Sequence, residues 1–175
     1  MGLPMATRSV PCTTRATVDQ IVGGRLVVPP LTHRLVGRRP GPGMSIAHAR
    51  LCLAYCGAVT LRRGTVGLDD FVPAALADPD TLALADRLMV IADGNPDPNA
   101  LLPQRVELDL ADGRTIACDI AEVLGSPARP LSPEATRAKF AQCVVDLPQG
   151  DALWDAVTGL EAQQHSGALA RLAAP

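Results

Sequence analysis

The chain has 175 residues, a length that suits one domain with a tail and allows roughly 70% of the unfolded surface to be buried. Its formal net charge of -2 argues against a nucleic-acid-binding protein, and its apolar runs are shorter than the roughly 20 residues that span a bilayer. We therefore expect a soluble, cytoplasmic protein with no nucleic-acid or membrane partner.

Residues 1–20 show no periodic pattern and are predicted to be irregular. Residues 24–28 are rich in β-branched and apolar residues and are followed by two prolines, which predicts a short strand at a sheet edge or the end of a strand. Positive charge is concentrated in residues 1–45, where Asp19 is the only acid and the six arginines are Arg8, Arg15, Arg25, Arg34, Arg38 and Arg39. Such a segment is either solvated or faces an anionic partner.

A central helix is predicted over residues 45–64, after a stiff loop at residues 38–43. Ser45 is the expected N-cap, and Gly64 can adopt the left-handed conformation that ends a helix. The helical spacing of its apolar residues predicts one wide buried face, formed by Leu51, Tyr55, Ala58, Val59 and Leu61.

The next segments alternate between helix and strand signals. Residues 68–76 suit a short helical turn, and Asp78 followed by Pro79 predicts the start of a helix that ends near residue 86. Residues 87–92 are predicted to form a strand. Two further strands, 104–110 and 114–120, flank Asp112-Gly113, a strong hairpin signal.

The C-terminal part is predicted to be helical. Ser132 and Pro133 begin a helix in which Ala138, Cys143 and Val144 are expected to be buried. A last helix begins at Asp151 with Leu153, Val157 and Leu160 on one side, and the alanine-rich end is expected to fray. The whole order predicts an α+β fold with a small, mainly antiparallel sheet covered by helices.

The sequence contains no glycine-rich phosphate loop, nucleophile elbow or histidine pair at metal spacing. Acidic residues such as Asp69 and Asp70 are expected on turns or solvent faces. Cys52 and Cys56 lie one helical turn apart, but no second pair of ligands accompanies them. We therefore predict no metal, no cofactor and five free thiols, at Cys12, Cys52, Cys56, Cys118 and Cys143.

Several stretches, in one continuous order over roughly residues 17–145, resemble the second, smaller domain of the MmgE/PrpD family. This family includes 2-methylcitrate dehydratase, cis-aconitate decarboxylase and iminodisuccinate epimerase. The stretches are residues 28–37, the central helix with Tyr55, residues 64–71, residues 93–99, the Asp112-Gly113 hairpin, residues 125–133 and the Lys139-Phe140 pair.

The resemblance implies a two-domain enzyme, usually dimeric, that acts on small di- or tricarboxylates without a metal. In this family an all-helical first domain carries much of the chemistry, and the second domain closes over the site as a lid. The lid contributes a Lys and a His from a Lys-x-x-Pro…His motif near its start, and a Tyr from its central helix.

The resemblance places Tyr55 at the family's tyrosine, as a catalytic candidate whose alternative role is that of a buried helical aromatic. It aligns Pro11 with the motif proline, so that Arg8 replaces the lysine and Arg15, or a neighbour, replaces the histidine, as substrate-binding candidates. Alternatively, residues 17–21 align with the approach to the first strand and the motif is missing. Arginine keeps the positive charge but cannot serve as a general acid or base near neutral pH.

We expect an irregular segment at residues 1–20, the MmgE/PrpD C-terminal α+β domain at 21–146 and a helical tail at 147–175. The preferred functional interpretation is a truncated lid domain of a 2-methylcitrate dehydratase-like lyase, inactive alone. Two alternatives stay open: a subunit of a split enzyme with a separate helical partner, and a non-catalytic carboxylate-binding module. The expected partner is a second copy or a helical-domain chain, bound through apolar faces around Trp154, Leu51 and Tyr55.

Overall fold

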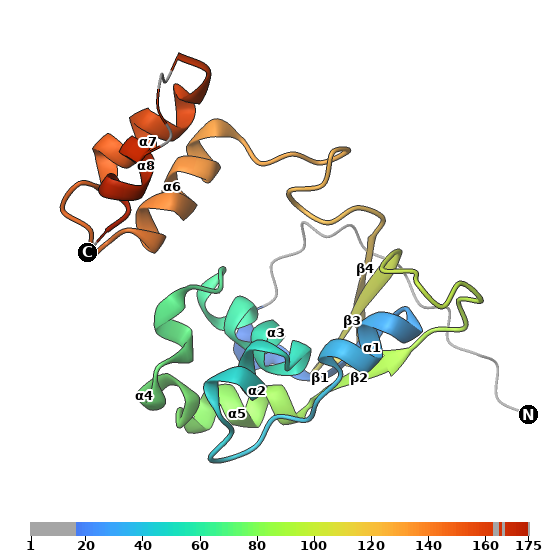
Figure 1. The fold of residues 1–175 in the computed structure, drawn as a ribbon. Helices are drawn as coiled ribbons and strands as arrows, with labels where there is room; N and C mark the ends of the chain where they lie inside the picture. The colour runs from blue at the N-terminus through green and yellow to red at the C-terminus, as the bar shows by residue number, and fades with distance from the viewer. Residues whose placement is uncertain (1–16, 163–164, 166, 175) are drawn as a thin grey trace, which may run out of the picture. The chain divides into compact units, whose positions relative to one another are not determined.

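Figure 1 shows the chain as a computed structural model, in which residues 17–162, 165 and 167–174 are described. The chain divides into two compact units, residues 1–123 and residues 124–175. Most of the segment predicted to be irregular lies outside the described residues, and its last three residues form a 3-10 turn at Val18–Gln20. In the described ranges, no helix has the length and apolar character that crossing a membrane requires.

The first unit is built on a four-stranded sheet. Its strands are β1 (Ile21–Val28), β2 (Leu88–Ala92), β3 (Gln104–Leu110) and β4 (Thr115–Ile120). They lie in the order β2-β1-β3-β4, with β1 and β2 parallel and the other two pairs antiparallel. The predicted α+β fold with a mainly antiparallel sheet is confirmed.

The β3–β4 hairpin forms where the sequence predicts it. Gly113 has a φ of 81°, a value that glycine adopts without a steric penalty. The backbone N–H of Arg114 donates to Oδ1 of Asp112 at 3.0 Å, which closes the turn. Alternate residues then point inward, so that Leu108, Leu110 and Ile116 are buried.

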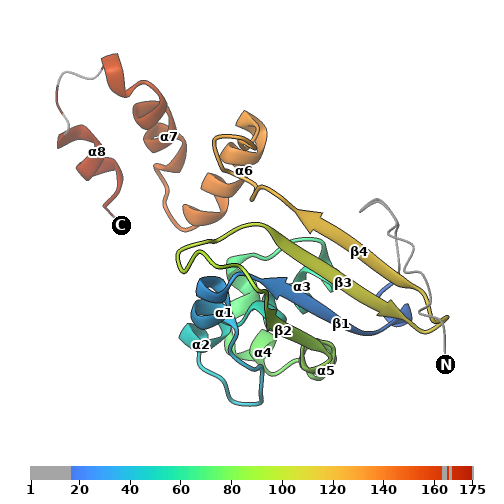
Figure 2. The same ribbon diagram turned by 90° about the vertical axis from the view of Figure 1, so that its right-hand side faces the viewer.

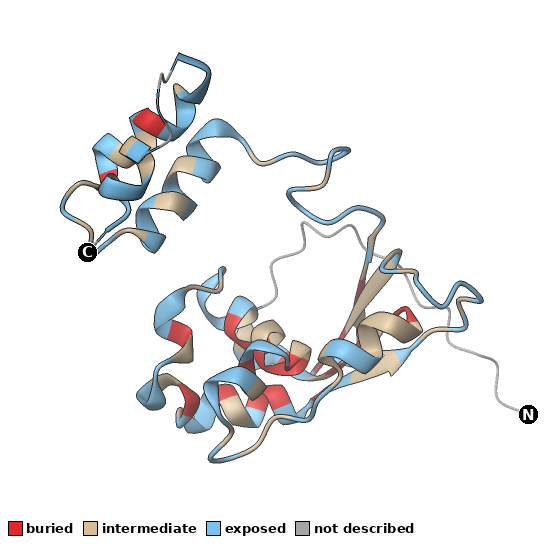
Figure 3. Cartoon of the chain, in the orientation of Figure 1, coloured by how far each residue is buried: buried red, intermediate tan, exposed pale blue. Residues whose placement is uncertain are grey.

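Helices cover one face of this sheet, as the two views in Figures 1 and 2 show. They are α2 (Ile46–Arg50), α3 (Leu53–Arg63), α4 (Pro73–Leu76) and α5 (Pro79–Asp86), with the 3-10 turn η2 (Leu68–Phe71) before α4. Figure 3 shows that the buried residues concentrate where these helices meet the strands. The core therefore lies between one helical layer and the sheet.

The predicted central helix is broken into α2 and α3. Ser45 caps α2 by accepting from the N–H of His48, and Gly64 ends α3 with a φ of 82°, so both predicted ends are confirmed. The break falls at Cys52, whose backbone is extended and forms an isolated β-bridge with Gly37. This long-range pairing removes Cys52 from the helical path.

Local sequence signals predicted one of the following two helices of the first unit and missed the other. Asp78 caps α5 by accepting from the N–H of Thr81 at 3.1 Å, as predicted. By contrast, α1 (Pro30–Val36) was not predicted, because the two prolines were interpreted only as the end of a strand. Pro30 occupies the first helical position, where its missing N–H has no cost.

The second unit contains α6 (Pro133–Cys143), α7 (Gly150–Thr158), the 3-10 turn η3 (Leu160–Ala162) and α8 (Gly167–Leu172). Ser132 caps α6 as predicted. Helix α8 lies in the stretch that was predicted to fray. The division between the compact units falls before α6, whereas the boundary at residue 146 stays a prediction about the extent of the family domain.

The burial predicted for α6 is wrong. Ala138 and Cys143 are exposed, Val144 is half-buried, and no residue within α6 is buried. The apolar residues of this helix are not gathered into one stripe, so the helix has no face to bury. Trp154 of α7 is half-buried and packs on Phe140, with 5.1 Å between the ring centroids.

Candidate functional site

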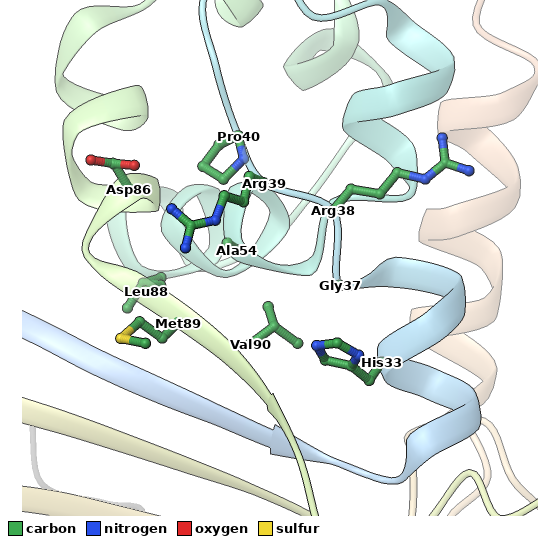
Figure 4. A pocket seen from close by; sticks show the side chains of 10 residues that line it. All are labelled: His33, Gly37, Arg38, Arg39, Pro40, Ala54, Asp86, Leu88, Met89 and Val90. Atoms are coloured by element: carbon green, nitrogen blue, oxygen red, sulfur yellow. The ribbon is translucent and has the colours of Figure 1, made fainter. Parts of the chain in front are cut away.

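A cleft in the first unit is the candidate functional site (Figure 4), with a cavity volume of about 470 Å³. It is bounded by α1, the loop that follows it, the start of α3, the end of α5 and β2. Its lining residues are His33, Gly37, Arg38, Arg39, Pro40, Ala54, Asp86, Leu88, Met89 and Val90.

The turn at the end of α1 brings the loop to the cleft. The N–H of Gly37 donates to the carbonyl oxygen of His33 at 2.8 Å and closes the last turn of α1. A Cβ atom at Gly37 would lie 2.4 Å from that same oxygen, so a larger residue cannot occupy this position without a backbone shift. Glycine is therefore required for the tight path from α1 into the two arginines.

The loop is held through its backbone. The thiol of Cys52 donates to the carbonyl oxygen of Arg38 at 3.1 Å, and Nε2 of His48 donates to the carbonyl oxygen of Arg39 at 2.8 Å. His48 is itself on the capped first turn of α2. These hydrogen bonds hold the backbone of the loop in place. They involve neither guanidinium group.

The two loop arginines differ from the ion-paired arginines of the first unit. Arg25, Arg62 and Arg63 each form an ion pair with a carboxylate. Arg38 and Arg39 form no ion pair with any residue in the described part of the chain. Within the described structure, therefore, no ion pair neutralises these two positive charges.

The sequence around the loop explains this excess of charge. Residues 20–68 contain no aspartate or glutamate, so no nearby acid along the chain can pair with the loop. In Figure 4 the guanidinium group of Arg39 points toward α5 and β2, whereas Arg38 extends the opposite way. Asp86, at the end of α5, is the one carboxylate among the lining residues.

Tyr55, the predicted catalytic residue, lies in the core and does not line the cleft. Its side chain is 1% exposed, and its hydroxyl donates to the carbonyl oxygens of Asp70 at 2.6 Å and Ala75 at 3.3 Å. Burial, reinforced by the Asp70 carboxylate, raises the pKa of the Tyr55 hydroxyl. The hydroxyl ties α3 to the η2–α4 segment, and its catalytic role stays a prediction.

Asp70 lies on the 3-10 turn η2, which agrees with the predicted turn, but its carboxylate is buried and not on a solvent face. It accepts from Arg63 at 2.5 Å and from the N–H of Gly67 at 2.7 Å. The apolar face predicted to be exposed around Tyr55 is also buried at that residue. Leu51 does remain partly exposed.

The other predicted site residues are not brought together by the described structure. Arg8 and Arg15 lie outside the described residues. Cys52, Cys56 and Cys143 are free, but Cys118 is disulfide-bonded, so the prediction of five free thiols is wrong. No group of three or more His, Cys, Asp or Glu side chains suited to a metal ion occurs among the residues that the structure describes.

The arginines of the cleft were counted in the sequence but not recognised as a site. The available signal was an Arg-Arg pair before a Pro-Gly turn, inside a long stretch without acids. This sequence pattern indicates a binding site only once the structure shows that α1, α5 and β2 form a cleft around the two arginines. Sequence reasoning instead favoured Arg8 and Arg15, by resemblance.

The sequence matches a known protein family. A family model described as the MmgE/PrpD C-terminal domain matches residues 9–157, which include the whole sheet, the cleft and α6. No match is found among curated proteins.

Proposed function

Because the chain belongs to the MmgE/PrpD family, whose C-terminal domain it contains, we propose that it acts as the lid domain of a lyase for small di- or tricarboxylates. The activity closest to this proposal is that of a 2-methylcitrate dehydratase. In this role the lid supplies positive charge that holds the substrate, and the reacting acid and base come from a helical domain.

The observation that carries this proposal is the unpaired charge of the cleft. Arg38 and Arg39 are fixed through their carbonyl oxygens, and their guanidinium groups have no carboxylate partner in the described structure. A guanidinium group matches the planar geometry of a carboxylate and binds it through two parallel hydrogen bonds. A lid that closes over a polycarboxylate requires such groups.

The same geometry supports the absence of turnover by the 175-residue chain alone. Arginine keeps its proton at neutral pH and cannot act as a general base. His33 and Asp86 lie on opposite sides of the cleft in Figure 4, and no hydrogen bond joins them among the described contacts. The loss of a positioned acid–base pair lowers a rate by about 10²–10⁴-fold.

A second candidate is a carboxylate-binding module without catalysis. It is favoured by the position of the cleft, because every lining residue comes from the first unit. Binding therefore needs no residue of another chain. A subunit of a split enzyme is the intermediate case, in which the helical domain is a separate chain.

The test is an assay of the purified chain with 2-methylcitrate and with cis-aconitate, with and without a helical first domain of the family supplied as a separate chain. We expect no turnover by the chain alone and turnover when the helical domain is present. Turnover by the chain alone would refute the proposed division of labour. Binding without turnover in both assays would favour the carboxylate-binding module.

A further inference from the structure

We infer that the loop of Arg38 and Arg39 is the carboxylate-binding element of the cleft, and that Arg39 is the residue that pairs with the ligand. The site takes a small di- or tricarboxylate, and it operates in the chain without a helical domain. This inference deepens the proposed function and rests on it for the class of ligand. It places anion binding on residues other than Arg8 and Arg15.

The loop of Arg38 and Arg39 is preorganised for binding. The carbonyl oxygens of both arginines are hydrogen-bonded, to Cys52 and to His48, so the loop backbone needs little ordering when a ligand arrives. Binding is stronger when this entropic cost has already been met by folding. The side chains themselves are exposed and unpaired in the described structure, and so no ion pair must break first.

The cleft is divided into a charged side and an apolar side. Figure 4 shows Arg39 across from Leu88 and Met89 of β2. Met89 is exposed and Val90 is half-buried, and both offer apolar surface to the carbon skeleton of a ligand. The cavity volume of about 470 Å³ lies within the range of roughly 300–1,000 Å³ that is usual for small-molecule sites.

Asp86 should oppose anion binding, so the effect of replacing it tests the inference independently of Arg39. Its carboxylate lines the same cleft as Arg39. Like charges within one cleft repel, so the carboxylate weakens the binding of an anion. Asp86→Asn should therefore tighten carboxylate binding, an effect opposite to that of removing Arg39.

The experiment is calorimetric titration of the full chain at low salt with citrate, propane-1,2,3-tricarboxylate and inorganic phosphate. We expect both carboxylates to bind, and Arg39→Gln to weaken them by about 10- to 100-fold, the cost of removing a charge-assisted pair. Asp86→Asn should strengthen binding about 2- to 5-fold. Circular dichroism of each variant reports whether the fold is kept.

The matched control is Arg34→Gln. Arg34 lies on α1, is exposed, and does not line the cleft, yet its replacement changes the net charge by the same amount. Its effect on citrate binding should be less than about twofold. An equal loss in Arg34→Gln and Arg39→Gln would show attraction by bulk charge and would overturn the assignment.

The remaining outcomes separate this inference from the proposed function. Absence of carboxylate binding by the folded chain overturns the inference, even if turnover appears with a helical domain. Carboxylate binding that depends on Arg39, without turnover in that reconstitution, supports the inference and rejects the lyase role. Phosphate that binds as tightly as citrate overturns the preference for carboxylates.

Discussion

The helices of the first unit and those of the second unit are stabilised in different ways. Of the 18 hydrophobic residues that are buried in the described part of the chain, 17 lie in the first unit and only Ala156 lies in the second. In the first unit a sheet provides an extended surface on which α3 and α5 bury their apolar sides. The first unit is therefore stabilised by long-range packing.

The second unit relies on local interactions. Ser132 caps α6, and Phe140 and Trp154 pack together with Arg137 stacked 4.9 Å from the Trp154 ring centroid. Arg137 also forms an ion pair with the exposed Asp151. Contacts of this kind contribute little each, and short helices are marginal without tertiary packing. Both units contain helices with similar sequence signals. These helices form a shared hydrophobic core only in the first unit, where a sheet gives them a surface to pack against.

The largest expected difference comes from removing core volume in the first unit. Leu84→Ala, at a residue that is 1% exposed, should lower the free energy of unfolding by about 2–5 kcal/mol. Urea denaturation followed by circular dichroism measures it. Trp154→Ala in the second unit should leave the main transition unchanged. Equal effects of the two substitutions would contradict the proposed difference between the units.

The next effect concerns the hydroxyl group of Tyr55. Tyr55→Phe keeps the ring in the core but leaves the carbonyl oxygen of Asp70 without this donor. An unpaired buried acceptor costs about 1–3 kcal/mol, and the main unfolding transition should shift accordingly. Thr60→Val is the control, because the Thr60 hydroxyl donates to a backbone carbonyl at an exposed site. An unchanged midpoint in Tyr55→Phe would show that this bond does not stabilise the core.

Helix caps allow a matched comparison between the units. Asp78 and Ser132 each accept from a backbone N–H at 3.1 Å. Asp78→Ala should lower the stability of the first unit by at least the roughly 0.5–2 kcal/mol of a lost cap, because it also removes the ion pair with Arg62. Ser132→Ala should reduce helical circular dichroism without moving the main transition. A shift of that transition in Ser132→Ala would mean that α6 unfolds together with the sheet.

The smallest effect is a dependence on pH. Hydrogen bonds from Arg105 and Arg25 lower the pKa of Glu107 below its ordinary 4.5. Because the folded-state pKa is below the unfolded one, the stabilisation is present above about pH 4.5 and is lost as pH falls through the folded-state value. Thermal midpoints should therefore drop between about pH 5 and 3, and less steeply in Glu107→Gln.

The control for this pH dependence is Glu161→Gln. Glu161 is exposed in the second unit and forms no ion pair among the described contacts. Its variant should follow the wild-type curve. A Glu107→Gln curve that is as steep as the wild-type curve would show that the ion pairs of β1, β3 and β4 do not couple to folding.

The sequence by itself determined the features that depend on neighbouring residues. The Asp112-Gly113 turn needs only a glycine with positive φ and an aspartate that closes the turn, and the caps at Ser45, Asp78 and Ser132 need only a side-chain oxygen near a free N–H. Strand alternation also predicted the hairpin. The resemblance to a known family also depends on short stretches of neighbouring residues, so it could be recognised before any tertiary contact was known.

Only the tertiary structure decided the break in the central helix and the cleft. Cys52 leaves the helical path because it pairs with Gly37, and the Arg39 loop is held because His48 lies beside it. Neither contact follows from helical periodicity, which describes neighbours within one element. The sequence placed Tyr55 on the wide apolar face of the central helix, but it did not predict the carbonyl oxygens that hold its hydroxyl. Contacts between distant segments depend on how the elements pack, and local sequence does not encode that geometry.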